Sequence, residues 1–221
     1  MASSTVENYL KTIYALQQKS DQGLVPMGQL ADAMQVVPGT ATSMIKTLAE
    51  SNLVDYTPRT GVRLTQGGQT LALHVLRRHR LVESFLVKVL KLDWSEVHAE
   101  AEVLEHAISD KVLEKIDEFL GNPQADPHGD PIPPANGAFV PANHDNLTLC
   151  RLGEPMCIAR IMDQDPDFLR FAEKHGLTPG VELTVEQRDA AADSITVRPV
   201  SSDPITIGTA AARKILVKPK G

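Results

Sequence analysis

Histidine and glutamate recur at helical spacing in two neighbouring segments of the chain. His79 and Glu83 are four residues apart, so both side chains lie on one side of a helix. The second segment carries a set at spacings of four, three and one: His98, Glu102, Glu105 and His106. Imidazole and carboxylate ligands without a thiolate suit Mn(II), Fe(II), Co(II) and Ni(II). Two helices that each present His and Glu on one face predict a metal site inside a helical domain.

The segments around these residues must supply the two helices. Apolar residues at helical spacing predict long helices from Gln69 to about Leu90 and from Trp94 to Leu120. Both helices carry more apolar side chains than the two could bury against each other. We therefore expect them to form the interface of a homodimer.

The N-terminal segment predicts three helices and a β-hairpin. Apolar periodicity places helices that begin near Ser3, Met27 and Thr40, the third ending at about Glu50. Residues 53–56 and 62–65 resemble two short strands joined by a turn at 57–61. This order is typical of a winged helix-turn-helix, which binds DNA but can also serve as a protein–protein module.

The third of these helices would enter the major groove of DNA. Its small polar side chains allow a close approach, and threonine methyl groups can meet thymine methyl groups. Lysine and threonine one turn further on suit phosphates, and the hairpin arginines can reach the backbone or the minor groove. The candidate DNA-contacting residues are Pro38, Thr40, Thr42, Ser43, Lys46, Thr47, Arg59 and Arg63.

Charge is distributed unevenly along the 221 residues, whose net charge is −6. Residues 1–80 hold eight Lys and Arg against five acids, and the remainder is strongly acidic. This asymmetry favours a DNA-facing half and a half that holds cations. We expect a cytoplasmic protein without a secretory signal or membrane span, in which Cys150 and Cys157 are reduced, buried core residues.

The last third of the chain changes in composition and period. A proline-rich connector covers residues 121–146, and apolar residues then alternate. The predicted strands are 147–149, 156–161, 181–185, 194–200 and 205–207, with a helix near 166–175. The fold class is therefore mainly α with a small β domain. We predict three domains: residues 1–73, residues 74–140 and residues 141–221.

Four segments resemble the diphtheria-toxin-repressor family of iron- and manganese-dependent regulators. They are the opening helix at 6–14, the two ligand helices at 78–83 and 97–106, and the segment Pro127-His128-Gly129-Asp130-Pro131-Ile132-Pro133. Residues 176–180 before a strand look like the SH3-like C-terminal β-barrel of the longer members. The resemblance covers the whole length and implies a winged helix-turn-helix, a helical dimerisation and metal domain, and this barrel.

The resemblance also implies two metal sites in each subunit. The primary site would use Asn8, Glu102, Glu105 and His106. The ancillary site would use His79, Glu83 and His98. Further ligands would come from the connector and the third domain, where the candidates are Asp126, His128, Asp163, Gln164 and Asp167.

Two positions depart from the iron-type pattern. Iron-type members have Met where Asn8 stands and Cys where Glu102 stands, whereas manganese-type members have Asp and Glu. Glu102 and the hard set of ligands favour Mn(II), with Fe(II) as the alternative and Co(II), Ni(II) or Zn(II) as surrogates. Lys11 stands where manganese-type members often carry a second acidic ligand, which argues against a binuclear primary site.

The sequence therefore predicts a metal-dependent repressor of metal-uptake genes. It would bind double-stranded operator DNA as a homodimer when it holds a divalent ion. A regulator whose ancillary site is only structural is a second interpretation. A metalloenzyme that activates water at the His/Glu site is a distant alternative, because it would leave the winged helix unexplained.

Overall fold

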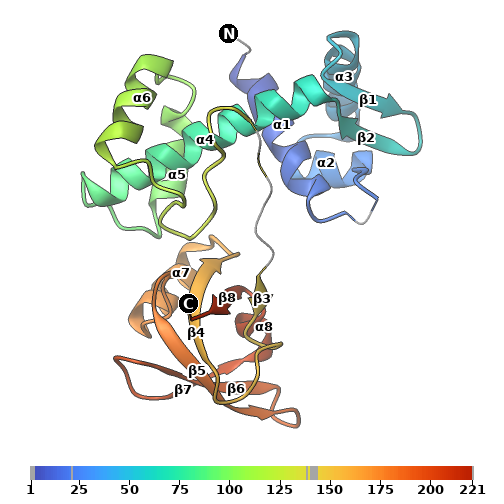
Figure 1. Cartoon of the computed structure of the whole chain (residues 1–221). Helices are drawn as coiled ribbons and strands as arrows, with labels where there is room; N and C mark the ends of the chain where they lie inside the picture. The colour runs from blue at the N-terminus through green and yellow to red at the C-terminus, as the bar shows by residue number, and fades with distance from the viewer. Residues whose placement is uncertain (1–2, 21, 138, 140–143, 221) are drawn as a thin grey trace. The chain divides into compact units, whose positions relative to one another are not determined.

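The computed structural model describes residues 3–20, 22–137, 139 and 144–220, whose helices and strands are labelled in Figure 1. The chain divides into two compact units. The first unit comprises Met1–Arg78 and Pro133–Phe139, and the second comprises His79–Ile132 and Val140–Gly221. The helical segment and the β domain therefore belong to one unit. The division into three domains at residues 73 and 140 remains a prediction.

The first unit contains the predicted winged helix. Helix α1 spans Ser4–Gln17 and begins where the Ser3 hydroxyl accepts a hydrogen bond from Val6 N. Helices α2 and α3 span Met27–Ala33 and Pro38–Glu50, and proline suits the first turn of α3 because it has no N–H to leave unpaired. Strands β1 (Val54–Thr57) and β2 (Gly61–Leu64) pair antiparallel. The order predicted for this segment is confirmed.

The first ligand helix has the expected form, but the second does not. Helix α4 spans Gln66–Lys88 and carries His79 and Glu83. The single helix predicted from Trp94 to Leu120 is wrong, because the chain forms α5 (Val97–Leu104) and α6 (Asp110–Phe119). The Ser109 hydroxyl accepts a hydrogen bond from Val112 N and starts a new helix there. Glu105 and His106 lie in the break.

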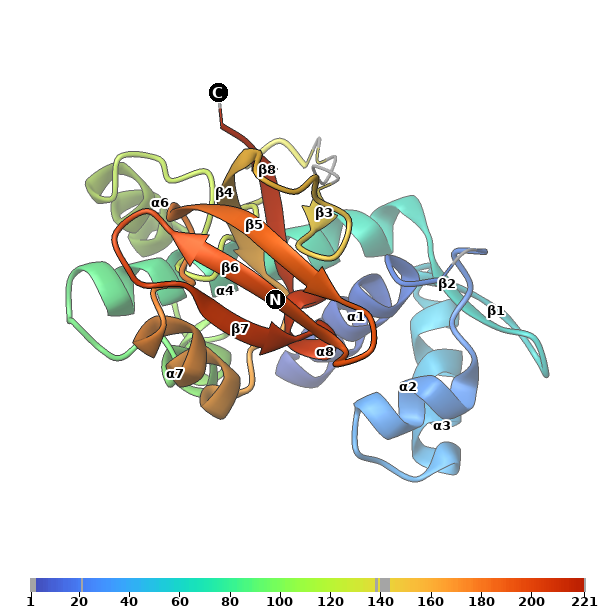
Figure 2. The same cartoon turned by 90° about the horizontal axis from the view of Figure 1, so that it is seen from below.

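The β domain is one antiparallel sheet of six strands in the order β3-β8-β4-β5-β6-β7 (Figure 2). The strands are β3 (Asp145–Asn146), β4 (Pro155–Ile161), β5 (Glu182–Asp189), β6 (Ser194–Pro199), β7 (Ile205–Gly208) and β8 (Ile215–Pro219). Helices α7 (Pro166–Lys174) and α8 (Thr209–Ala212) complete it. The strand predicted at 147–149 is wrong, because these residues form a turn that follows β3, and β8 and α8 were not predicted.

One hydrophobic core joins the β domain to the helical segment of the second unit. Trp94, between α4 and α5, is buried in the core formed by the sheet, and Val87 of α4 packs against the same core. Cys150 is buried there and Cys157 is half-buried, both as free thiols. No helix among the described residues is long and apolar enough to cross a membrane.

Gly129 marks a close backbone approach between the 126–130 loop and β4. Its φ is +85°, and an added Cβ would lie 2.1 Å from the Ala159 carbonyl oxygen and 2.7 Å from Arg160 Cα. Only glycine fits this position. Gly121 has a similar φ of +76° with nothing within 4 Å of its Cβ position. A substitution there would therefore cause backbone strain without a collision.

We predict that Gly129→Ala lowers the free energy of unfolding by about 3 kcal/mol, from strain and collision together. Gly121→Ala has strain alone and should lose about 1 kcal/mol. Chemical denaturation of both variants measures the difference. Equal losses would show that the close approach to β4 is not a constraint.

Candidate metal centre

Three overlapping groups of side chains in the second unit could hold a metal ion. They are His79 with Glu83 and His98, His79 with Glu102 and Glu105, and Glu83 with Asp126 and His128. In each group one potential ligand atom per residue lies within 4.8 Å of the others. Helix α4 contributes to all three, α5 and the break after it contribute to the first two, and the 126–130 loop contributes to the third.

The first group has the dimensions of one face of an octahedron. His79 Nε2 lies 2.9 Å from Glu83 Oε1 and 3.1 Å from His98 Nδ1, and His98 Nδ1 lies 3.3 Å from Glu83 Oε1. An ion with bonds of about 2.2 Å places neighbouring octahedral ligands about 3.1 Å apart. The three atoms can therefore bind one octahedral ion with little movement.

Glu105 orients His79 for this role. Its Oε2 lies 2.6 Å from His79 Nδ1, and its side chain is fully buried. When an ion is bound, a proton on Nδ1 donated to this carboxylate would leave Nε2 as the lone-pair nitrogen facing the ion, whereas without an ion the same Nε2 lies in hydrogen-bond contact with Glu83. Carboxylate–histidine contacts of this kind fix the tautomer of metal-binding histidines.

The predicted primary set is divided between the two units. Glu105 Oε1 lies 3.3 Å from His106 Nε2, and Glu102 Oε1 lies 3.9 Å from His79 Nδ1, so these residues meet within the second unit. Asn8 lies on α1 of the first unit. The complete four-residue primary site therefore stays a prediction.

In the third group, the tautomer of His128 follows from its hydrogen bond. His128 Nε2 lies 2.8 Å from the Trp94 carbonyl oxygen, which only accepts, so Nε2 carries the proton. In the neutral ring Nδ1 then has a lone pair, 3.9 Å from both Glu83 Oε2 and Asp126 Oδ1. His128 Nδ1, Glu83 Oε2 and Asp126 Oδ2 are buried without a hydrogen-bond partner. Such unpartnered polar atoms fit a bound cation.

The two buried carboxyls of this group have opposite electrostatic environments. Burial raises the pKa of Glu83, but hydrogen bonds from His79 and His98 and nearby histidine charges outweigh it and hold that pKa below its ordinary value. Burial, followed by the charges of Asp130 and Glu83, raises the pKa of Asp126 well above its ordinary value. Asp126 is therefore the carboxyl that gains most from a nearby cation.

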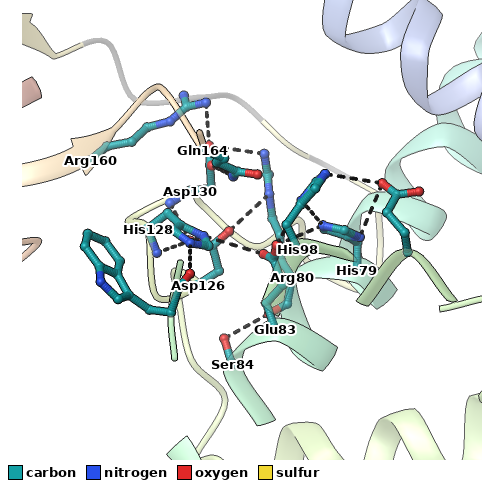
Figure 3. A network of polar contacts seen from close by, with 12 residues as sticks. His79, Arg80, Glu83, Ser84, His98, Asp126, His128, Asp130, Arg160 and Gln164 are labelled. Carbon is teal, nitrogen blue, oxygen red and sulfur yellow. Dashed lines mark hydrogen bonds and ion pairs between the residues drawn. The ribbon is translucent and has the colours of Figure 1, made fainter. Parts of the chain in front are cut away.

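The 126–130 loop is held by contacts with α4 and the β domain (Figure 3). Asp126 Oδ1 accepts hydrogen bonds from the backbone N–H groups of His128 and Asp130. Asp130 forms ion pairs with Arg80 and Arg160 and accepts a hydrogen bond from Gln164 Nε2 at 3.0 Å. These contacts place Asp126 and His128 beside Glu83.

Sequence reasoning missed the roles of Asp130, Arg80, Arg160 and Trp94. Asp130 belongs to the 127–133 segment that matches the family, so a signal existed, but its partners are 30 to 50 residues away in the chain. No helical or strand spacing predicts such pairs. The contacts depend on the tertiary fold alone.

The candidates from the third domain lie outside the three groups. Asp163 pairs with Lys214 at 2.5 Å, and Asp167 pairs with Arg170 at 2.7 Å on the surface of α7. Of the three neighbouring candidates, Gln164 contacts the loop, through Asp130. A ligand role for Asp163 or Asp167 remains a prediction.

The candidate DNA-contacting residues lie on the surface of the winged helix, outside its hydrophobic core. Ala41, Ile45 and Leu48 turn the opposite face of α3 into the core. The exposed candidates are Pro38, Thr40, Ser43, Lys46, Thr47, Arg59 and Arg63, and Thr42 is half-buried with its hydroxyl bonded to the Pro38 carbonyl. Arg63 also pairs with Asp55 at 3.1 Å. Contact of these residues with DNA remains a prediction.

We predict that Asp126→Asn stabilises the metal-free protein by about 1 kcal/mol. Asparagine keeps the acceptor for the two backbone N–H groups but removes the buried charge that faces Glu83 and Asp130. Thermal unfolding in chelator measures the effect, with Asp203→Asn as an exposed control. A destabilised Asp126→Asn protein would refute the repulsion argument.

Comparison with known proteins places the chain in a family. Residues 1–62 match the iron dependent repressor N-terminal DNA binding domain, and residues 65–134 match the iron dependent repressor metal binding and dimerisation domain. Residues 146–219 match the FeoA domain. The matched segments follow one another along nearly the whole chain.

Individual relatives agree with these matches. The iron-dependent repressor IdeR of Mycobacterium leprae (strain TN) is 32% identical over 199 residues, which cover 84% of this chain and 85% of IdeR. A solved manganese-dependent transcriptional repressor in complex with manganese is 42% identical, with a TM-score of 0.85 and coverage of 96% of this chain and 98% of that one. ScaR with bound Cd²⁺ is 31% identical, with a TM-score of 0.79 and coverage of 97% and 99%.

These relatives are regulators and not enzymes, so the metalloenzyme alternative is set aside. They include both iron- and manganese-dependent proteins, which leaves the metal as a separate question. The chain belongs to the diphtheria-toxin-repressor family of metal-dependent transcriptional repressors, as a long member with a FeoA-type SH3-like domain.

Proposed function

We propose that this protein is a cytoplasmic, manganese-responsive repressor. It binds operator DNA as a homodimer and controls metal-uptake genes. The observation that carries the metal assignment is the ligand set of the second unit. It consists of imidazoles and carboxylates, with Glu102 where iron-type relatives carry cysteine. Such ligands in octahedral spacing suit Mn(II). Iron(II) is the second candidate, because relatives such as IdeR are described as iron-dependent.

The proposed sites follow the family pattern. Asn8, Glu102, Glu105 and His106 form the primary site, which joins α1 to the dimerisation domain. His79, Glu83 and His98 form the ancillary site. Asp126 and His128 supply further ligands next to it, which their burial and unpartnered atoms support.

The proposed switch depends on whether a cation is bound among the carboxylates of the primary site. A bound ion adds positive charge among these groups. Without it, Glu102 at the end of α5 and Glu105 just after that helix are neighbouring acids, and no shared ion joins them to α1. DNA binding changes only by the difference in ion affinity between the two arrangements.

Exposed apolar side chains support a homodimer. Val103 on α5 and Val112 and Phe119 on α6 are 71%, 50% and 71% exposed in the single chain. Large apolar groups on adjacent helices are typical of a protein–protein contact. They lie in the segment that matches a dimerisation domain.

We predict that Mn(II) raises the affinity for the protein's own promoter DNA by about 5–150-fold, and that a chelator reverses it. A gel shift with and without Mn(II) measures the change. DNA binding that ignores Mn(II) and Fe(II) would contradict the metal switch.

Anaerobic titration of operator binding with Mn(II) and with Fe(II) distinguishes the two candidate metals. We expect Asn8→Asp to lower the Mn(II) concentration needed by about tenfold, since an anionic ligand replaces a neutral one. Glu102→Cys should favour Fe(II) over Mn(II) relative to the unaltered chain. A stronger response of the unaltered chain to Fe(II) would favour the iron-responsive alternative.

The dependence of DNA affinity on salt concentration tests the DNA interface. Lys46 is exposed on α3, and Lys46→Ala should weaken binding to all sequences and reduce the slope of log K against log salt by about 1. Lys174→Ala, on α7 in the β domain, is the matched control and should leave the slope unchanged. An unchanged slope for Lys46→Ala would remove this residue from the interface.

A further inference from the structure

Glu83 uses its two carboxylate oxygens in different directions. Oε1 faces His79 Nε2 at 2.9 Å and His98 Nδ1 at 3.3 Å. Oε2 is buried without a hydrogen-bond partner and lies 3.9 Å from His128 Nδ1. One carboxylate therefore belongs to two groups of potential ligands.

The second group has its own need for a cation. Glu83 Oε2, Asp126 Oδ2 and His128 Nδ1 are all unpartnered, and the three side chains are fully buried. Leaving such buried polar atoms unsatisfied carries a free-energy cost. An ion bound by His79 and His98 on the Oε1 side would leave this cost in place, because Asp126 and His128 are not part of that group.

Arg80 does not remove this need. Its Nε lies 3.9 Å from Asp126 Oδ2, beyond hydrogen-bond distance. Its terminal nitrogens bond the Pro131 carbonyl at 2.5 Å and Asp130 Oδ1 at 3.4 Å. The guanidinium therefore holds the loop in place without satisfying the free oxygen of Asp126.

We propose that Glu83 bridges two divalent cations, one held by His79 and His98 and the other by Asp126 and His128. The ancillary centre is then binuclear, in addition to the primary site. This inference rests on the proposed function, since it divides the ancillary centre of that function into two positions. Carboxylate-bridged ions lie about 3.5–4 Å apart in two-metal sites.

The second position is tied to the β domain. The Trp94 carbonyl orients His128, and the His128 carbonyl accepts a hydrogen bond from Ile161 N of β4 at 2.8 Å. Asp130 binds Arg160 and Gln164 of the same domain. The ion beside Asp126 therefore occupies a position that needs the β domain in contact, whereas the ion beside His98 is held by α4 and α5.

The two positions are counted by equilibrium dialysis of the full-length protein against Mn(II), followed by metal analysis. His98→Ala removes a ligand from one position and His128→Gln from the other. Glutamine retains an N–H donor for the Trp94 carbonyl, so the loop should keep its fold. His79 stays unchanged because it also contacts Glu105.

We expect each single variant to lose one bound ion, and the double variant and Glu83→Gln to lose two. The Mn(II) electron paramagnetic resonance spectrum should show spin coupling in the unaltered protein and lose it in both single variants. If His98→Ala, His128→Gln and the double variant all lose the same one ion, a single shared ion explains the centre. If His128→Gln loses none, there is no ion at the second position.

A gel shift on the same samples separates this inference from the proposed function. Operator binding that needs Mn(II) while the count shows a single shared ion overturns the bridged pair alone. Operator binding without a metal requirement overturns the proposed function. Circular dichroism of each variant verifies the fold, and the double variant supplies the count if Glu83→Gln does not fold.

Discussion

The fully buried carboxylate of Glu83 is the constraint on which the second unit depends. An ionised carboxylate away from water is costly unless partners compensate its charge. Two histidines hydrogen-bond this carboxylate, His79 from the same helix and His98 from α5, and His128 of the 126–130 loop faces its second oxygen. α4, α5 and the loop therefore meet at one carboxylate, which is also a member of two candidate metal groups.

The same loop explains why the β domain and the helical segment form one unit. Asp130 accepts bonds from α4 and from the β domain, and Gly129 allows the backbone of β4 to approach within the volume of a missing side chain. Trp94 packs into the sheet's core while its carbonyl orients His128. Packing that stabilises the domain contact therefore also sets the geometry of a metal ligand.

Local spacing predicted the parts of the site that a single helix determines. His79 and Glu83 meet because they are four residues apart on α4, and the winged helix followed from apolar periodicity and the turn at 57–61. The break at residues 105–109 was missed, because apolar residues continue at helical spacing across it and Ser109 starts a new helix. The bonds of Asp130 and Trp94 were beyond reach, since each joins segments that only the tertiary fold brings together.

The positions of the proposed ligands in the two units distinguish metal binding from coupling to DNA. The ancillary ligands and three of the four proposed primary ligands belong to the second unit, so their mutual geometry does not depend on the DNA-binding unit. Asn8 is the one proposed ligand in the first unit, and it offers a neutral carbonyl oxygen instead of a carboxylate. The free energy transmitted to DNA cannot exceed the difference in ion affinity between arrangements with and without this ligand. In the proposed arrangement, tight binding of metal and strong switching are therefore separate properties, and the second depends on residue 8.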